Sequence, residues 1–322
     1  MSQKVINWLL EFDQPGLTYR VLTEVLGKAQ DDPEVQSAKS SIPSSAAVEG
    51  IFAQMHPDGY WLQKNYKGEV LGAGEAYGSF GTTHFVLSYL SELGMNRSDA
   101  RIAKAVDRYL NLQQADGSWN GHFSCRYTYN IRTFVKMGFR EDPRVQRSIE
   151  LMLESGRKDG GYLCDMHEGK YKTRETKSCI RGCAKAILAY SELPEYWEHP
   201  RCLQLVDYSL NREVLWSTRK PNQLVNQDMA RASFPIIWRS SFWEPIYALS
   251  KMGYGRHPKM QRAWAYLESR LDEMGRLALD FTPAQAPWKV GKRGEPNPWL
   301  TLYVQLAMKY RETQPMAYMD VE

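Results

Sequence analysis

The chain has 322 residues, of which 43% are hydrophobic and 24% charged, a balance typical of a globular protein with a large apolar core. The net charge of +4 gives no reason to expect binding to nucleic acid or to a membrane surface, and no apolar run approaches the roughly 18 residues of a transmembrane helix. The five cysteines are too few and odd in number for a disulfide framework, and residues 1–8 show no signal segment, so we expect a reduced, cytoplasmic protein.

Two short phrases recur along the chain and mark its helices. One phrase begins a helix with Asp-Pro or His-Pro, where Pro suits the first helical turn and the residue before it can cap the helix. The other is a Gly turn, and the helices after these turns mostly end in a glycine that is followed by a hydrophobic residue, as at Gly94-Met95, which is typical of a C-terminal cap. The first phrase opens at Asp32, Asp142, His199 and His257, and the turns contain Gly59, Gly117, Gly160 and Gly275.

These phrases predict six helical hairpins. Helices that follow the Gly turns are expected to begin near residues 17, 79, 124, 178, 240 and 298. Their partners are expected near residues 32, 98, 142, 199 and 257, with a sixth partner in Val5 to Glu11. Each hairpin must bury its apolar face on its neighbours, and no alternating stretch predicts a sheet.

We therefore predict one all-α domain over residues 1–322, an (α/α)6 toroid: a closed double ring of six helical hairpins, with one set of helices inside. The alternative that the repeats leave open is an open solenoid.

Some of the repeats resemble known families. The stretch Gln114-Ala115-Asp116-Gly117-Ser118-Trp119 resembles the Gln-to-Trp motif of squalene and hopene cyclases, and Gly160-Gly161 followed by Cys179 is similar to a segment of protein prenyltransferase β subunits. As a repeat pattern the resemblance covers nearly the whole chain. It implies an α/α toroid with its ligand in a central cavity, at the mouth of the inner helices.

The activity motifs of those families do not match. The chain lacks the Asp-x-Asp-Asp acid of class II cyclases and the Asp-Asp-x-x-Asp metal motif of class I terpene synthases. Lys177 stands where a prenyltransferase has a zinc-binding Asp, and residues 240–249 contain no His. The closest resemblance is to uncharacterised bacterial proteins with squalene-cyclase-like repeats.

A cluster of cysteine and histidine residues predicts a metal site. Its members are Cys164, His167, Cys179 and Cys183. Thiolates and imidazoles are typical ligands of tetrahedral zinc, and the two cysteines four residues apart share one helix face. Zinc is therefore the expected cofactor. A zinc ion bound by four protein ligands would be structural, and one bound by three protein ligands and a water would be catalytic. The alternative is that Cys179 and Cys183 are small core residues.

Polar and aromatic residues gather at the predicted N-terminal ends of the inner helices, where free N–H groups favour anions. The candidate ligand-binding residues are Arg126, Tyr127, Tyr129, Arg181, Arg239 and Trp243, and the candidate catalytic residues are His84, Cys125 and Glu244. His and a buried carboxyl can act as acid or base, and a Cys beside an Arg can act as nucleophile. Alternatively, the arginines pair with acidic loop residues, and Glu244 pairs with Arg239 or Arg231.

These features predict an enzyme that acts on a small, partly apolar substrate in the central cavity, with isoprenoid-like compounds as candidates. The reaction would be cyclisation, isomerisation, elimination or group transfer, with or without zinc. The alternative is a toroid that binds a ligand or partner without catalysis and carries a structural zinc. A relative of protein prenyltransferases is the least favoured reading because of Lys177. No nucleic-acid partner is expected, and the oligomeric state is left open.

Overall fold

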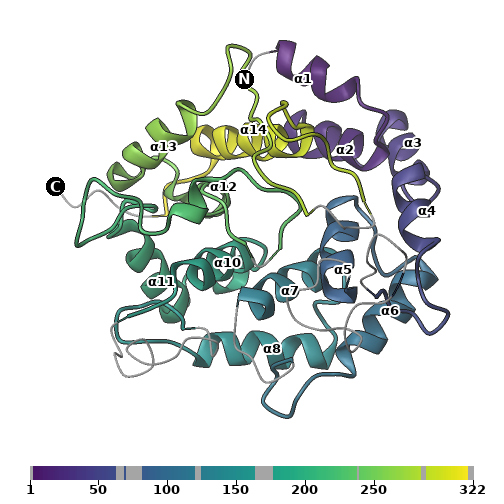
Figure 1. Cartoon of the computed structure of the whole chain (residues 1–322), viewed down its shortest axis with the longest axis horizontal. Helices are drawn as coiled ribbons and strands as arrows, with labels where there is room; N and C mark the ends of the chain where they lie inside the picture. The colour runs from purple at the N-terminus through teal and green to yellow at the C-terminus, as the bar shows by residue number, and fades with distance from the viewer. Residues whose placement is uncertain are drawn as a thin grey trace.

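The computed structural model describes residues 3–62, 69, 82–119, 125–163, 177–237, 239–283 and 288–317, with only the backbone of Cys125 and Arg126. This part of the chain is helical and contains isolated bridges but no strand. Figure 1 shows the helices as two concentric rings. None of the described helices is both long and apolar enough to cross a membrane.

The inner ring consists of helices that begin within about four residues of the predicted positions. They are α2 (Pro15–Arg20) with its continuation η1 (Val21–Val25), α5 (Thr83–Glu92), α7 (Cys125–Lys136), α10 (Ile180–Tyr190), α12 (Trp243–Leu249) with η4 (Ser250–Tyr254), and α14 (Pro298–Thr313). From α5 to α14 each packs against the next, and α14 also packs against η1. Between α2 and α5, Gly16 lies so close to Leu93 that an ideal Cβ would come within 2.1 Å of its carbonyl oxygen. The ring is therefore closed, and the predicted α/α toroid is confirmed.

The outer ring contains the predicted partner helices. They are α1 (Gln3–Leu10), α3 (Pro33–Ser41), α6 (Ala100–Leu110), α8 (Pro143–Glu154), α11 (Pro200–Leu210) and η5 (Pro258–Met260) with α13 (Gln261–Glu268). A further helix, α4 (Ala46–Phe52), was not predicted from the sequence. Two short 3₁₀ helices, η2 (Pro194–Tyr196) and η3 (Gln227–Ala230), lie in connections.

The local signals act as the sequence predicts. The Asp142 carboxylate accepts a hydrogen bond from the Arg144 N–H at 2.9 Å and so caps α8. His199 caps α11 in the same way through its ring nitrogen. Gly94 ends α5 with a φ of 90°, a left-handed conformation that glycine adopts without strain.

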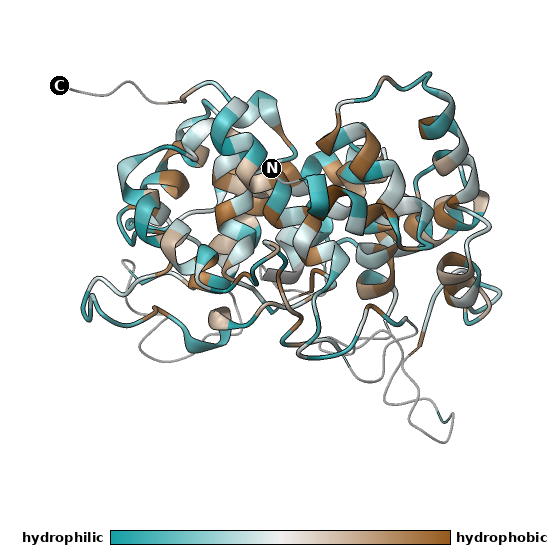
Figure 2. Ribbon diagram, turned by 90° about the horizontal axis from the view of Figure 1, so that it is seen from above, coloured by the Kyte–Doolittle hydropathy of each residue, from teal (hydrophilic) through white to brown (hydrophobic). Residues whose placement is uncertain are grey.

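The core follows the ring. One cluster of buried apolar side chains extends from Val5 to Ala307, although a single domain over the whole chain stays a prediction. Figure 2 shows the helices from the side, with several of the described connections gathered on one side of them. We call the end at which the inner helices begin the mouth.

A segment of the chain occupies the centre of the ring. Residues 231–237, which we call the plug, lead into α12, and the Ser88 hydroxyl of α5 donates to the Ile236 carbonyl at 2.8 Å. The Phe234 ring stacks on Trp299 of α14 with centroids 5.6 Å apart. Phe234, Ile236 and Ile237 are buried. Apolar side chains of the protein itself therefore fill part of the region in which a central cavity was expected.

Candidate functional site

His84 and Tyr129, both predicted site residues, meet between α5 and α7. His84 Nδ1 lies 2.5 Å from the Tyr129 hydroxyl, and both side chains are buried. The rings of Phe85 and Tyr109 lie beside His84, at 4.0 and 6.1 Å between centroids. A hydrogen-bonded His–Tyr pair can relay a proton. Tyr127 instead packs against Trp119 at 5.6 Å and belongs to the surrounding core.

Glu244 has a partner that the sequence did not indicate. Lys185 Nζ of α10 lies 2.7 and 2.6 Å from its two carboxylate oxygens, and both side chains are buried. The alternative that Glu244 pairs with Arg239 or Arg231 is therefore wrong, because Lys185 reaches across from the neighbouring inner helix. Burial raises the pKa of Glu244, and the positive charge of Lys185 opposes this.

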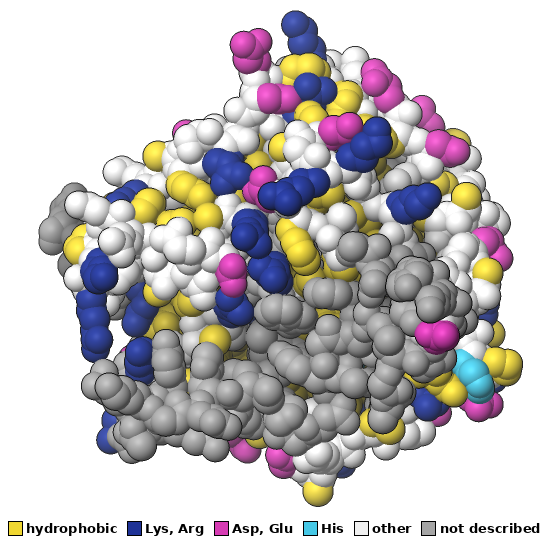
Figure 3. Space-filling view, viewed as in Figure 1, with side chains coloured by type: hydrophobic (Ala, Val, Ile, Leu, Met, Phe, Trp, Pro, Cys, Tyr) yellow, Lys and Arg dark blue, Asp and Glu magenta, His cyan; other side chains and the backbone are white. Residues whose placement is uncertain are grey.

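Arg181 and Arg239 pair with one acidic residue, as the alternative interpretation predicted. Both form ion pairs with Asp228 of η3, with 3.5 Å between Arg239 Nη1 and the carboxylate. Burial lowers the pKa of Arg239; Asp228 opposes this, and the positive charges of Arg231 and Arg181 lower it further. Positive charge is thus concentrated near the heads of α10 and α12. Figure 3 shows Lys and Arg side chains gathered near the middle of one face.

Trp243 connects the plug to the inside of the ring. Its ring stacks on Tyr303 at 4.5 Å, and its Nε1 donates to the Ser233 carbonyl at 3.3 Å. Because the side chain is buried by these contacts, its position is that of a core residue.

Cys179 and Cys183 are the two members of the Cys/His cluster that the structure describes, and one of them lies in the core. Cys183 is buried, its sulfur accepts from the Tyr162 N–H at 3.3 Å, and burial raises the pKa of its thiol to about 12. Cys179 is the N-terminal cap residue of α10 and is half-buried. Cys164 and His167 lie outside the described residues. Within the described residues no group of three or more ligating side chains could hold a metal, so the zinc site stays a prediction.

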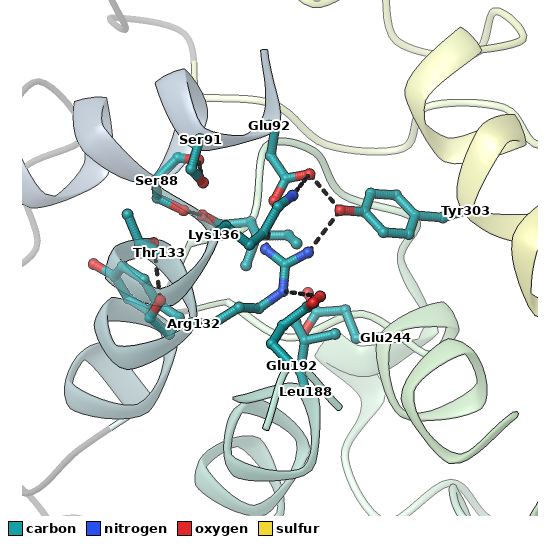
Figure 4. A network of polar contacts seen from close by, with 12 residues as sticks. Ser88, Ser91, Glu92, Arg132, Thr133, Lys136, Leu188, Glu192, Glu244 and Tyr303 are labelled. Atoms are coloured by element: carbon teal, nitrogen blue, oxygen red, sulfur yellow. Dashed lines mark hydrogen bonds and ion pairs between the residues drawn. The ribbon is translucent and has the colours of Figure 1, made fainter. Parts of the chain in front are cut away.

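A buried ionic network, which the sequence analysis missed, lies inside the ring (Figure 4). Glu92 at the end of α5 is fully buried and binds three cationic side chains: Arg132, Lys136 at 3.0 Å and Arg20 at 3.1 Å. The Tyr303 hydroxyl donates to Glu92 and accepts from Arg132 at 2.8 Å.

A second carboxylate extends the network. Glu192, which follows α10, binds Lys251 of η4 at 2.7 Å and lies 3.6 Å from Arg132 Nε. We call the whole set the axial network; its members are Arg20, Glu92, Arg132, Lys136, Glu192, Lys251 and Tyr303. Every inner helix contributes a side chain to the axial network, either from the helix itself or from the residues directly after it.

A signal for this network is present in the repeats. Glu92, Lys136 and Lys251 each stand two residues before the glycine that ends an inner helix. Charged residues at the same repeat position, on helices with buried surroundings, indicate that they face one another across the ring.

Comparisons with known proteins identify the fold. No protein-family model and no curated protein matches the chain. A glycosyl hydrolase family 88 protein from Bacteroides vulgatus is 15% identical, with a TM-score of 0.51 over 96% of this chain and 97% of that one. A polysaccharide lyase is 12% identical, with a TM-score of 0.51 over 98% and 99% of the two chains. The type II terpene cyclase MstE from Scytonema is 15% identical, with a TM-score of 0.46 over 84% and 72%.

The chain shares the fold of the hydrolase and the lyase. This toroid brings the charges of the axial network together, and burial and proximity shift the pKa values of Glu92 and Lys136. Burial would raise the pKa of Glu92, but the charges of Arg132, Lys136 and Arg20 hold it well below its usual range. Burial lowers the pKa of Lys136 to about 7, which Glu92 opposes and Arg132 and Arg20 reinforce. The Lys136 ammonium can therefore lose its proton near neutral pH.

We expect the Lys136 ammonium to make stability depend on pH. Its pKa of about 7 in the fold lies below the ordinary 10.5, so between these values the unfolded chain binds more protons. The free energy of unfolding therefore rises with pH between these two values, by up to about 1 kcal/mol per pH unit. The same contribution is lost as the pH falls toward 7.

Urea unfolding at several pH values, for wild type and Lys136→Met, measures this contribution. The stability of wild type relative to the variant should rise from neutral to alkaline pH. Lys292→Met, at an exposed lysine, should keep the pH dependence of the wild type. Equal pH dependence in wild type and Lys136→Met would contradict the assignment.

Proposed function

We propose that this chain is an enzyme that acts on a small anionic molecule, such as a carboxylated sugar, at the mouth of the toroid. The observation that carries the proposal is the group of Arg181, Arg231 and Arg239 around Asp228. Guanidinium groups bind carboxylates through paired, charge-assisted hydrogen bonds. The similar fold of a glycosyl hydrolase and a polysaccharide lyase supports a saccharide as substrate.

Among the reactions that the sequence analysis considered, elimination best suits a substrate whose carboxylate is bound by arginines. A base takes the proton from the carbon next to the carboxylate, a carbon–carbon double bond forms as the C–O bond to the leaving group breaks, and the leaving oxygen takes up a proton. Guanidinium groups would stabilise the negative charge that builds up on the carboxylate. We assign the proton transfer to His84 with Tyr129, and keep Cys125 and Glu244 as alternatives.

Polyuronates test this proposal directly. Wild-type protein should produce the ultraviolet absorbance of a double bond conjugated to a carboxylate. Arg239→Ala should lower kcat/KM by roughly tenfold to a hundredfold, because a hydrogen bond to a charged group is lost. His84→Ala should abolish turnover while glucuronate still binds.

Arg276→Ala is the matched control, because Arg276 forms an exposed ion pair with Asp272 on an outer turn. It should leave turnover unchanged. If wild type neither binds glucuronate nor converts any polyuronate, the proposal is wrong.

A second candidate is a toroid that binds an anion without catalysis. The filled centre of the ring favours it, since the plug residue Phe234 and the buried Glu92 occupy positions where an enzyme of this architecture would hold substrate. In that case glucuronate binds, Arg239→Ala abolishes the binding, and no polyuronate is converted.

The apolar substrate and the zinc remain proposals of lower rank. An isoprenoid-like chain needs apolar space, and Phe234, Ile236 and Ile237 take up such space at the centre. Zinc would be held by Cys164, His167, Cys179 and Cys183, and would require the buried Cys183 thiol to lose its proton.

A further inference from the structure

Residues 288–297, which we call the mouth loop, lead directly into α14 and carry three exposed cations. Trp288 and Val290 are buried, and the Asn297 side chain donates to the Val290 carbonyl, so these contacts hold the loop in place. The exposed cations are Lys289, Lys292 and Arg293. Glu295 lies 3.6 Å from Lys292 and compensates only one of these charges.

Backbone hydrogen bonds join the mouth loop to the arginine group through one intervening segment, which contains Leu279 and Phe281. The Leu279 N–H donates to the Glu295 carbonyl of the mouth loop at 2.9 Å. Two residues further on, the Phe281 carbonyl accepts from the Phe234 N–H of the plug at 3.3 Å. The Arg239 guanidinium carbon lies 4.6 Å from the centre of the Phe281 ring. Segments paired in this way are about 5 Å apart, so the mouth loop and the arginine group belong to one surface.

This surface carries the excess positive charge of the protein. We call it the basic arc; its cations are Arg181, Arg231, Arg239, Lys289, Lys292 and Arg293. Among the described residues of the same segments, the carboxylates are Asp228, Asp280 and Glu295, and Asp280 is paired with Arg270 at 2.7 Å. Six cations against the two remaining carboxylates leave four positive charges, which equals the net charge of +4 of the whole chain. The basic arc is therefore where the protein attracts a polyanion.

The basic arc follows the rim of the mouth. Its cations lie at the beginnings of α10, α12 and α14 or on the segments that lead into them, and these three inner helices are consecutive neighbours in the ring. A single sugar acid reaches only one part of such an arc, whereas a chain with a carboxylate on every unit contacts several of its cations at once.

We propose that the basic arc binds a polyuronate chain, so that the substrate is a polymer. This inference rests on the proposed function: the arginine group holds the carboxylate of the sugar that reacts, and the mouth loop holds carboxylates of sugars further along the chain.

The test compares galacturonate with its linear decamer by isothermal titration calorimetry on the full chain. Wild type should bind the decamer about tenfold or more tightly than the monomer, because several carboxylates are held at once. Lys292→Gln combined with Arg293→Gln should weaken the decamer about fivefold to tenfold and leave galacturonate unchanged. Both side chains are exposed, so this variant should keep the Tm of wild type.

Two control variants separate the mouth loop from net charge and from shape. Arg256→Gln combined with Lys259→Gln removes the same two charges from the connection between η4 and η5, beyond the opposite end of the inner helices, and should bind the decamer like wild type. Lys292→Arg combined with Arg293→Lys keeps both charges on the mouth loop and should also bind like wild type.

The proposal is overturned if the decamer binds no more tightly than galacturonate, or if the mouth-loop variant loses no more affinity than the variant of Arg256 and Lys259. It is also wrong if a single-stranded RNA decamer binds wild type more tightly than the galacturonate decamer does, because the arc then fits another polyanion better.

Failure of the proposed function has a different outcome. If the mouth-loop variant weakens the decamer but wild type converts no polyuronate, the basic arc binds the polymer and the chain is no enzyme for it. If wild type converts polyuronates and the mouth-loop variant keeps the same KM, the proposed function holds and this inference is wrong.

Discussion

Replacing Glu92 with Gln should lower the free energy of unfolding by about 3–5 kcal/mol. Glu92 is fully buried, and Arg132, Lys136 and Arg20 all bind its carboxylate. Glutamine has nearly the same shape but no charge, so the guanidinium groups of Arg132 and Arg20 would remain close together with their shared anion removed. Urea denaturation at neutral pH measures the loss.

Glu295→Gln is the control, since Glu295 forms an exposed ion pair with Lys292 and its removal should cost less than about 1 kcal/mol. Adding Lys136→Met to Glu92→Gln should restore part of the stability, because a buried amine that has lost its anionic partner is removed. If Glu92→Gln unfolds at the same urea concentration as Glu295→Gln, the carboxylate does not hold the ring together.

The fold could be predicted because its signals are local and repeated. Asp142 before Pro143 caps a helix through its own neighbour, and Gly94 ends another by its own conformation. Such signals place each helix along the chain. Each hairpin must bury its apolar face against its neighbours, and a closed ring gives every hairpin a neighbour on both sides.

The site could be predicted only in part, because its contacts join distant repeats. His84 and Tyr129 were both expected at the mouth, and they meet there. Lys185 and Glu244 are 59 residues apart, and no local pattern indicates which charged residue on the next helix will face a given carboxylate. The axial network was detectable only by aligning the repeats on their final glycines, as with Glu92 and Lys136.

The plug shows why the centre of the ring was harder to predict than its walls. Residues 231–237 belong to a connection and follow neither repeated phrase. Phe234 is nevertheless buried against Trp299 and Tyr89 on two different inner helices. A connection that enters the ring determines how much of the centre stays open, and this depends on tertiary packing.

The pair of Lys185 and Glu244 separates a structural role from a catalytic one. Lys185→Met should destabilise the protein by about 3–5 kcal/mol, because it leaves the buried Glu244 carboxylate without its cation. The double variant Lys185→Met with Glu244→Leu removes both charges and fills their space with apolar atoms. We expect it to unfold within about 1 kcal/mol of wild type, or to be more stable.

This rescue also tests the chemistry of Glu244. If the double variant is stable and still converts the substrate that wild type converts, Glu244 serves to join α10 to α12 and is no acid or base. If it is stable but inactive, the carboxyl group takes part in the reaction. If it is as unstable as Lys185→Met alone, apolar side chains cannot replace the pair, and the hydrogen bonds of Lys185 to both carboxylate oxygens are required for packing at this position.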